Sequence, residues 1–61
     1  MKYAVIPIAK AIPVHYTNDA LEAVTLFAAY ACRGIAITLS RRHEGDDKPA
    51  DYYDIIDQAN I

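Results

Sequence analysis

The sequence has little of the chemistry that usually stabilises very small proteins. It contains one cysteine, Cys32, so no internal disulfide can form and no second cysteine can begin a zinc site. A chain of 61 residues buries only about 60% of its unfolded surface. Scaffolds of this size usually depend on a disulfide, a metal or a partner subunit. With the first two missing, we expect oligomerisation, a binding partner or unusually good packing to stabilise the fold.

Long apolar runs and export signals are also missing. No segment approaches the ~20 apolar residues that a transmembrane helix needs. The first residues lack the basic, apolar and cleavage regions of a signal peptide, and Met1 leads directly into a sequence typical of a strand. Together with the unpaired cysteine, this predicts a cytoplasmic protein.

The chain also lacks the basic excess that nucleic-acid-binding proteins show. Its net charge is −2, from 6 basic and 8 acidic residues. Residues 1–43 hold five basic and two acidic residues, whereas residues 44–61 hold one basic and six acidic residues. The chain is therefore mildly basic at one end and acidic at the other, and a nucleic-acid partner is unlikely.

The N-terminal segment, residues 2–16, has the alternating pattern of a strand. Pro7, Pro13 and His15 occupy odd positions, and five apolar residues occupy even positions: Ile6, Ile8, Ile12, Val14 and Tyr16. This period predicts strand with the even positions facing the core. Either one long or kinked strand forms, or the chain bends around residues 9–11 to give two strands. The pattern leaves both alternatives open.

Residues 19–33 carry the clearest helical signal. Thr17 or Asn18 can cap the helix, and Gly34 follows its last residue. The apolar arc is wider than the ~100° of an ordinary surface helix, which predicts a long apolar helix covered on two sides. A small sheet can cover only part of that arc. We therefore expect a homo-oligomer, most simply a homodimer, with this helix or a strand edge at its interface. The helix residues expected in that interface are Leu26, Phe27 and Tyr30.

The second half of the chain predicts a strand, a charged loop and a second helix. Residues 35–40 alternate, and residues 41–48 are polar with Gly45 among them. Pro49 suits a first helical turn, and Tyr52, Ile55, Ile56 and Ala59 recur at helical spacing. The predicted fold is one α+β domain over residues 1–61, in the order β(β)-α-β-α. Its single sheet packs against the long helix, and a short amphipathic helix follows at the C-terminus.

No residue pattern indicates catalysis or a cofactor. The two histidines, His15 and His43, lack metal-ligand spacing, and no glycine-rich phosphate loop is present. Cys32 falls at a helix C-terminus with no base nearby, and we interpret it as a small core residue. We therefore predict a non-enzymatic protein with no cofactor and no metal.

The charged segment is the predicted partner-binding site, although a solvated strand end followed by an inert charged loop would explain it too. Arginine forks suit carboxylate or phosphate surfaces, and mixed charges select partners. Tyr53 lies off the apolar stripe of the predicted last helix, which would expose it. Whether the acidic end imitates a row of phosphates stays open. The predicted partner-binding residues are Arg41, Arg42, His43, Glu44, Asp46, Asp47 and Tyr53.

The stretch from Ile12-Pro13-Val14 through Asp19-Ala20-Leu21-Glu22-Ala23 to Gly34 and Arg41 resembles small phage-encoded host-takeover proteins. In layout and length it is similar to the bacterial RNA polymerase inhibitors of T7-like phages. About half of the chain is covered. Leu39 stands where that family has another basic residue, and the acidic C-terminal segment has no counterpart there.

The resemblance implies a small inhibitor or modulator, phage or mobile-element derived, that binds a larger host protein complex in the host cytoplasm. Two alternatives remain: a self-assembling accessory or structural protein, and a nucleic-acid-binding dimer. The net charge of −2 disfavours the second of these.

Overall fold

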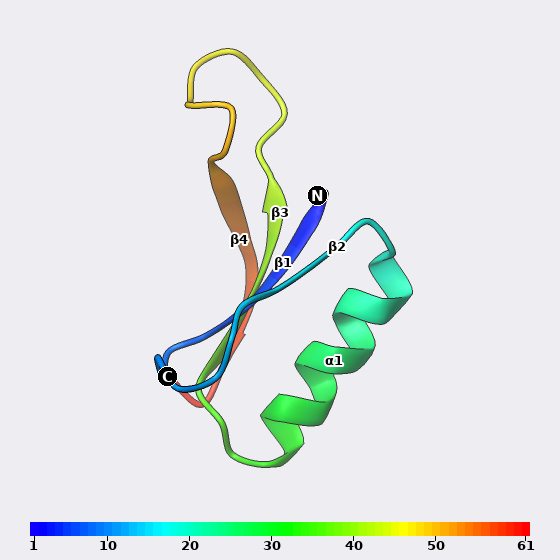
Figure 1. Ribbon diagram of the computed structural model, residues 1–61, viewed down its shortest axis with the longest axis vertical. Coiled ribbons are helices and arrows are strands. Elements are labelled where there is room, and N and C mark those ends of the chain that lie inside the picture. Colours follow the sequence, from blue (N-terminus) through cyan, green and yellow to red (C-terminus); the bar gives the residue numbers. More distant parts are fainter.

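The computed structural model describes residues 1–61 and contains one antiparallel sheet and one helix (Figure 1). The strands lie in the order β2-β1-β3-β4. The helix packs on β1, β2 and β3 from one side of the sheet. This confirms the α+β class and the packing of one sheet against a helix. The elements are β1 (Tyr3–Pro7), β2 (His15–Thr17), α1 (Ala20–Cys32), β3 (Ile37–Arg42) and β4 (Tyr53–Ala59).

The N-terminal segment forms two strands, so the second of the two open alternatives is correct. β1 and β2 pair antiparallel, with Val5 opposite His15. The connecting residues 8–14 form a wide bend, in which the Ile12 amide donates to the Ala9 carbonyl at 3.2 Å. Pro7 ends the first strand and Pro13 lies in the bend, where neither removes a donor that the centre of the sheet needs.

The predicted orientation of these strands is wrong. Tyr3 and Val5, at odd positions, pack towards α1, and Val5 is fully buried there. The even positions Ile6 and Tyr16 lie on the opposite face, because side chains alternate along a strand. Both parities of this segment are rich in apolar residues. Alternation alone could therefore not identify the side that the helix covers.

The helix is shorter and less covered than predicted. Asp19, rather than Thr17 or Asn18, is its N-cap, because its carboxylate accepts from the Leu21 amide at 2.9 Å. Gly34 follows the helix with φ of 76°, as its position indicated. Ala23 is the one fully buried helix residue. The sheet covers one side only, so the prediction of cover on two sides is wrong.

The side of the helix away from the sheet carries apolar residues that we predicted to be buried. Leu21 and Val24 are exposed, and Cys32, interpreted as a core residue, is exposed as well. With 13 residues, α1 falls short of the length and apolar character that crossing a bilayer requires, and the chain has no other helix.

The predicted C-terminal helix does not exist; β4 occupies its place. β4 pairs antiparallel with β3, from Arg42 opposite Tyr53 to Ile37 opposite Ala59. The register shifts between Leu39 and Ser40, so one extra residue of β4 bulges out. Because of this bulge, the apolar residues of β4 do not alternate with polar ones in the sequence. Ile55, Ile56 and Ala59 therefore show a spacing that resembles that of a helix. Without β4, β3 would have unpaired backbone N–H and C=O groups along one edge. Hydrogen bonds to these groups favour a strand over a helix for residues 53–59.

Asn60 closes the fold beyond β4. It adopts a positive φ of 61°, a conformation that asparagine tolerates. Its side-chain amide donates to the carbonyls of Ala31 and Ile35, at 2.9 and 3.0 Å. These bonds satisfy a carbonyl at the helix C-terminus and tie the last strand to the segment that leads into β3.

Ile37 should be a main determinant of stability. Its side chain is fully buried in the cluster with Val5, Ala23 and Leu39. We expect Ile37→Ala to lower the free energy of unfolding by about 2–5 kcal/mol in a urea titration. The control is Leu21→Ala, at a helix position 74% exposed, which should change it by less than about 0.5 kcal/mol. Equal effects of the two substitutions would contradict this assignment of the core.

Candidate protein-binding surface

The predicted partner-binding residues gather at one end of the molecule. β3 and β4 form a hairpin whose ten-residue connection, residues 43–52, extends beyond the sheet (Figure 1, yellow and orange). The β1–β2 bend lies at the other end. Arg41 and Arg42 end β3, and Tyr53 begins β4 directly opposite Arg42. We call residues 41–53 the hairpin end.

The two arginines point to opposite faces of the sheet. Arg41 lies in register with Tyr3 and Asp54, whereas Arg42 lies beside Tyr53 on the face away from α1. Arg42 is engaged in the fold, because its Nε donates to the Ala50 carbonyl at 2.8 Å. Arg41 is exposed and makes no hydrogen bond or ion pair. The pair is therefore not one continuous cationic patch.

His43 organises the loop through two carboxylates. Its Nδ1 lies 2.6 Å from Asp54 Oδ2, and its Nε2 lies 2.7 Å from Asp47 Oδ1. A carboxylate accepts hydrogen bonds, so both ring nitrogens donate only when the imidazole is protonated. The bonds to Asp47 and then to Asp54 raise the pKa of His43 above its ordinary value. The same contact with His43 lowers the pKa of Asp47.

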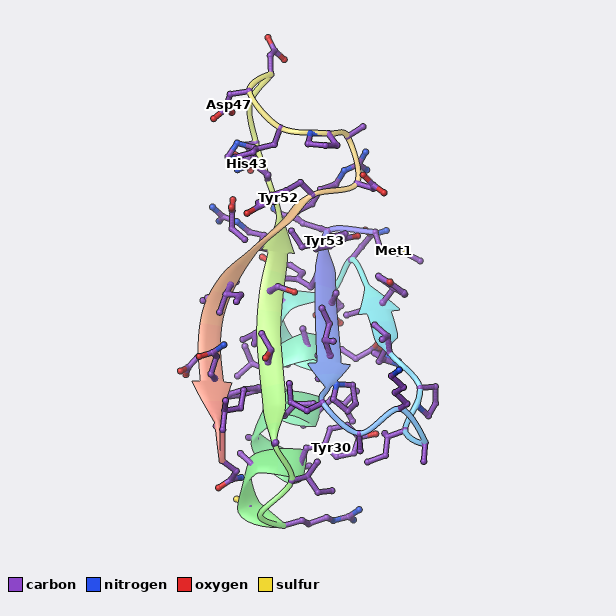
Figure 2. The ribbon with its side chains drawn as sticks, turned by 90° about the vertical axis from the view of Figure 1, so that its left-hand side faces the viewer. Met1, Tyr30, His43, Asp47, Tyr52 and Tyr53 are labelled. Atoms are coloured by element: carbon purple, nitrogen blue, oxygen red, sulfur yellow. The ribbon has the colours of Figure 1, made fainter.

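An aromatic side chain and a glycine complete this cluster (Figure 2). The Tyr52 ring meets the His43 ring edge-on, with centroids 5.8 Å apart, and the Lys48 ammonium lies 5.2 Å from the Tyr52 centroid. Gly45 has φ of 141°, and a Cβ there would lie 3.1 Å from Asp47 Oδ1. Only glycine fits this backbone beside the histidine–carboxylate pair.

Tyr52 lies outside the core, although the spacing of the predicted helix placed it inside; its side chain is 42% exposed. Glu44 and Asp46 are exposed and make no hydrogen bond or ion pair. The loop therefore combines side chains that hold its shape with others that are free to contact a partner. No group of His, Cys, Asp and Glu in the chain is arranged to hold a metal ion.

Tyr53 is half-buried rather than exposed, because it belongs to a strand and packs over the sheet. Its hydroxyl donates to the Met1 carbonyl at 2.6 Å. Its ring lies 6.0 Å from the ring of Tyr16, on the opposite edge strand. The edge strands are three strand spacings apart, roughly 14 Å, so both rings lean inward over the central strands.

Small residues in the two central strands allow this contact. Ala4 and Ser40 are direct partners, and both are almost completely buried on the face away from the helix. The Ser40 hydroxyl donates to the Ala4 carbonyl at 3.1 Å. We name Tyr16 and Tyr53 the tyrosine pair. Sequence reasoning missed it, because only the strand register brings residues 16 and 53 together.

A shallow hollow of 280 Å³ lies beside the hairpin end. The Lys2 amide donates to Asn18 Oδ1 at 2.9 Å at its base. The hollow mixes cationic and anionic groups. Its lining residues are Met1, Lys2, Asn18, Arg42, His43 and Glu44.

The three residues predicted for an oligomer interface lie against the sheet. Leu26, Phe27 and Tyr30 are half-buried and pack on the core of their own chain. The large apolar side chains that α1 leaves open are Leu21 and Val24 instead. Only the remaining exposed parts of the predicted residues are accessible to a second molecule.

No protein-family model, curated protein or solved structure matches the chain. What the hairpin end can bind therefore follows from its own side chains. Its exposed groups include carboxylates, arginine, Lys48 and Tyr52, and its histidine is held between two carboxylates. This is a charged, internally braced loop on the end of a sheet.

The His43 contacts predict a pH dependence of stability. A pKa raised above 6.5 in the folded state stabilises the fold fully below pH 6.5, and this contribution is lost as the pH rises through the folded pKa. The lowered pKa of Asp47 adds a contribution that is lost as the pH falls through the folded pKa of Asp47, below 3.8. We expect His43→Gln to destabilise the protein more at about pH 5.5, where the imidazole is protonated, than at a pH well above the folded pKa of His43, where the imidazole is neutral.

The direct measurement is an NMR titration of the His43 ring. Its pKa should lie above 6.5 and should fall in Asp47→Asn, which removes one carboxylate. Asp46→Asn removes a neighbouring charge that makes no contact with the ring, and it is the matched control. A His43 pKa at or below its ordinary value, or equal effects of the two substitutions, would show that the cluster does not form in solution.

Proposed function

We propose that this chain is a non-enzymatic binding protein that inhibits or modulates a larger host protein complex, with the hairpin end as its contact surface. The observation that carries the proposal is the construction of that end. His43 is held by Asp47 and Asp54, and Arg42 by the Ala50 carbonyl, while Arg41 and Asp46 remain exposed.

A braced loop suits binding for an energetic reason. Association costs free energy for every flexible segment that it immobilises, and a loop already held in one shape avoids much of that cost. The His43 cluster and the hydrogen bond from the His43 amide to the Tyr52 carbonyl, at 2.8 Å, hold both ends of the connection. Loops carried on a rigid sheet are also frequent sites of function.

The charge pattern favours a protein partner with both signs of charge. Arg41 and Asp46 lie within six residues of each other, and the surrounding loop is predominantly acidic. Exposed pairs of this kind contribute little to stability. They do steer association and reject partners with the wrong pattern. An acidic loop also repels nucleic acid, which favours a protein partner over the nucleic-acid alternative.

The resemblance to phage inhibitors of bacterial RNA polymerase supports the inhibitory role and a phage or mobile-element origin. It rests on the segment from Ile12 to Arg41, which includes β2, α1 and β3. The hairpin end lies mostly outside that segment. The target of this chain can therefore differ from that of the family, and the partner is proposed here by class only.

The proposal predicts that one large host complex is captured from a bacterial lysate by the immobilised chain. Arg41→Glu and Asp46→Lys, tested separately, should each slow association with the purified complex by about tenfold. Both side chains are exposed and unbonded, so circular dichroism and melting should stay unchanged. The matched control is Arg33→Glu at the C-terminal end of α1, an exposed residue away from the hairpin end, which should bind normally.

Three outcomes would overturn the proposal. Recovery of no host protein, with the chain capturing only itself, would favour the self-assembling alternative. Loss of the captured material after nuclease treatment would favour nucleic acid. Undiminished binding by both Arg41→Glu and Asp46→Lys would place the contact surface elsewhere on the molecule.

A further inference from the structure

Neither a helix nor a loop covers the face of the sheet away from α1 (Figure 2), and large apolar side chains are exposed on it. The register places Ile6, Tyr16 and Ile55 on it, and Tyr16 and Ile55 are 53% and 62% exposed. Ile8 continues the pairing of β1, since its amide donates to the Ala36 carbonyl at 3.1 Å, and it is exposed as well. Among the strand residues on this face, Arg42 is the only charged one. We call this surface the open face.

The helix side of the sheet supplies a small core. Four residues form its buried cluster, and 9 of the 61 residues of the chain are buried in total. A core of this size is marginal for a chain of this length, and small scaffolds commonly gain stability by assembling. An additional apolar face permanently in water is a liability for such a protein. A partner that is present whenever the chain is folded would bury this face and prevent non-specific association. A second copy of the same chain is always present in this sense.

The edges of the sheet are protected against pairing with another sheet. β4 carries Asp54 and Asp57 and is interrupted by the bulge, and β2 is three residues long. Charges, bulges and short strands are the devices that block edge-to-edge association. Assembly by extending the sheet is therefore disfavoured. Packing of one open face on another, as in a sandwich of two sheets, remains available.

The size of the face limits such an interface. The longest strand, β4, has seven residues and is roughly 23 Å long, and the four strands span roughly 14 Å across the sheet. The strands alone therefore offer less than the ~800 Å² that each partner buries in a stable interface, and exposed residues next to them, such as Ile8, add to the area. The face also has an interface composition, with tyrosine and isoleucine exposed on it and its one charge at the end.

Charge selects the relative direction of the two copies. The loop of residues 44–51 carries Glu44, Asp46, Asp47 and Asp51 against Lys48, whereas Lys10 lies in the bend at the opposite end. Strands running in the same direction would place the two acidic loops together. The opposite direction keeps the two acidic loops apart, which is the favourable arrangement.

We propose that a second copy of this chain covers the open face, in a two-fold symmetric dimer with antiparallel sheets and with Tyr16 and Ile55 in the interface. A two-fold interface uses the same patch on both copies, so each open face covers the other and no surface is left to continue the assembly. The hairpin ends then lie at opposite ends of the dimer. This inference concerns the chain alone and does not depend on the proposed host partner.

The test is sedimentation equilibrium of the purified chain with no host protein present. The wild-type chain should have twice its monomer mass of 6.8 kDa at micromolar concentration. Ile55→Lys introduces a charge at an exposed position of the open face, and it should raise the dissociation constant by at least about a hundredfold. The matched control, Leu21→Lys, introduces the same charge on the exposed side of α1 and should leave the dimer intact.

A wild-type monomer at high micromolar concentration would overturn the proposal, as would a dimer that survives Ile55→Lys or dissociates with Leu21→Lys instead. An NMR experiment on the wild-type chain gives the answer without a substitution that could unfold it. In a mixture of labelled and unlabelled chains, contacts between copies should join Ile6, Tyr16 and Ile55. Contacts confined to Leu21 and Val24 would assign the interface to the helix.

Discussion

The antiparallel pairing of β1 with β3 is the constraint on which both faces of this protein depend. It joins residues thirty or more positions apart and places Val5 opposite Leu39 on one side and Ala4 opposite Ser40 on the other. On the first side, these apolar residues form the bed for α1, and Ala23 lets the helix approach closely. On the second side, the two small residues leave room for the tyrosine pair. One register therefore determines both the core and the open face.

The buried core and the proposed contact surface lie in different parts of the molecule. The buried cluster lies between the helix and the middle of the sheet, whereas the hairpin end extends beyond it and is braced by polar and aromatic contacts of its own. Tyr53 connects the two regions, because it begins β4 at the base of the loop and packs on Tyr16 over the centre of the sheet. Covering the open face would therefore also fix the base of the hairpin. In the proposed dimer the two hairpin ends lie apart, and two linked sites bind a partner that has two matching sites more tightly than one site does.

The features predicted well from the sequence are those with local causes. Helix formers between a capping residue and Gly34 led to α1, and the alternation after Gly34 led to β3, two residues early. The charged segment was also found as a unit, because its residues are adjacent in the chain. The sequence did not show which residues of this segment hold its shape and which are free. His43 is held by Asp47 and by Asp54, and Asp54 lies across the hairpin on β4.

By itself, the sequence determined that one helix would form between residues 19 and 33, that no disulfide could assist it, and that acidic residues would gather towards the C-terminus. Each of these follows from composition or from neighbours a few positions apart. Tertiary structure alone decided that Tyr53–Ala59 is a strand, which parity of β1 faces the helix, and that Tyr16 meets Tyr53. In all three cases local preferences were nearly balanced. Hydrogen bonds offered by the free edge of β3, and the burial of one of two apolar faces, tipped the balance.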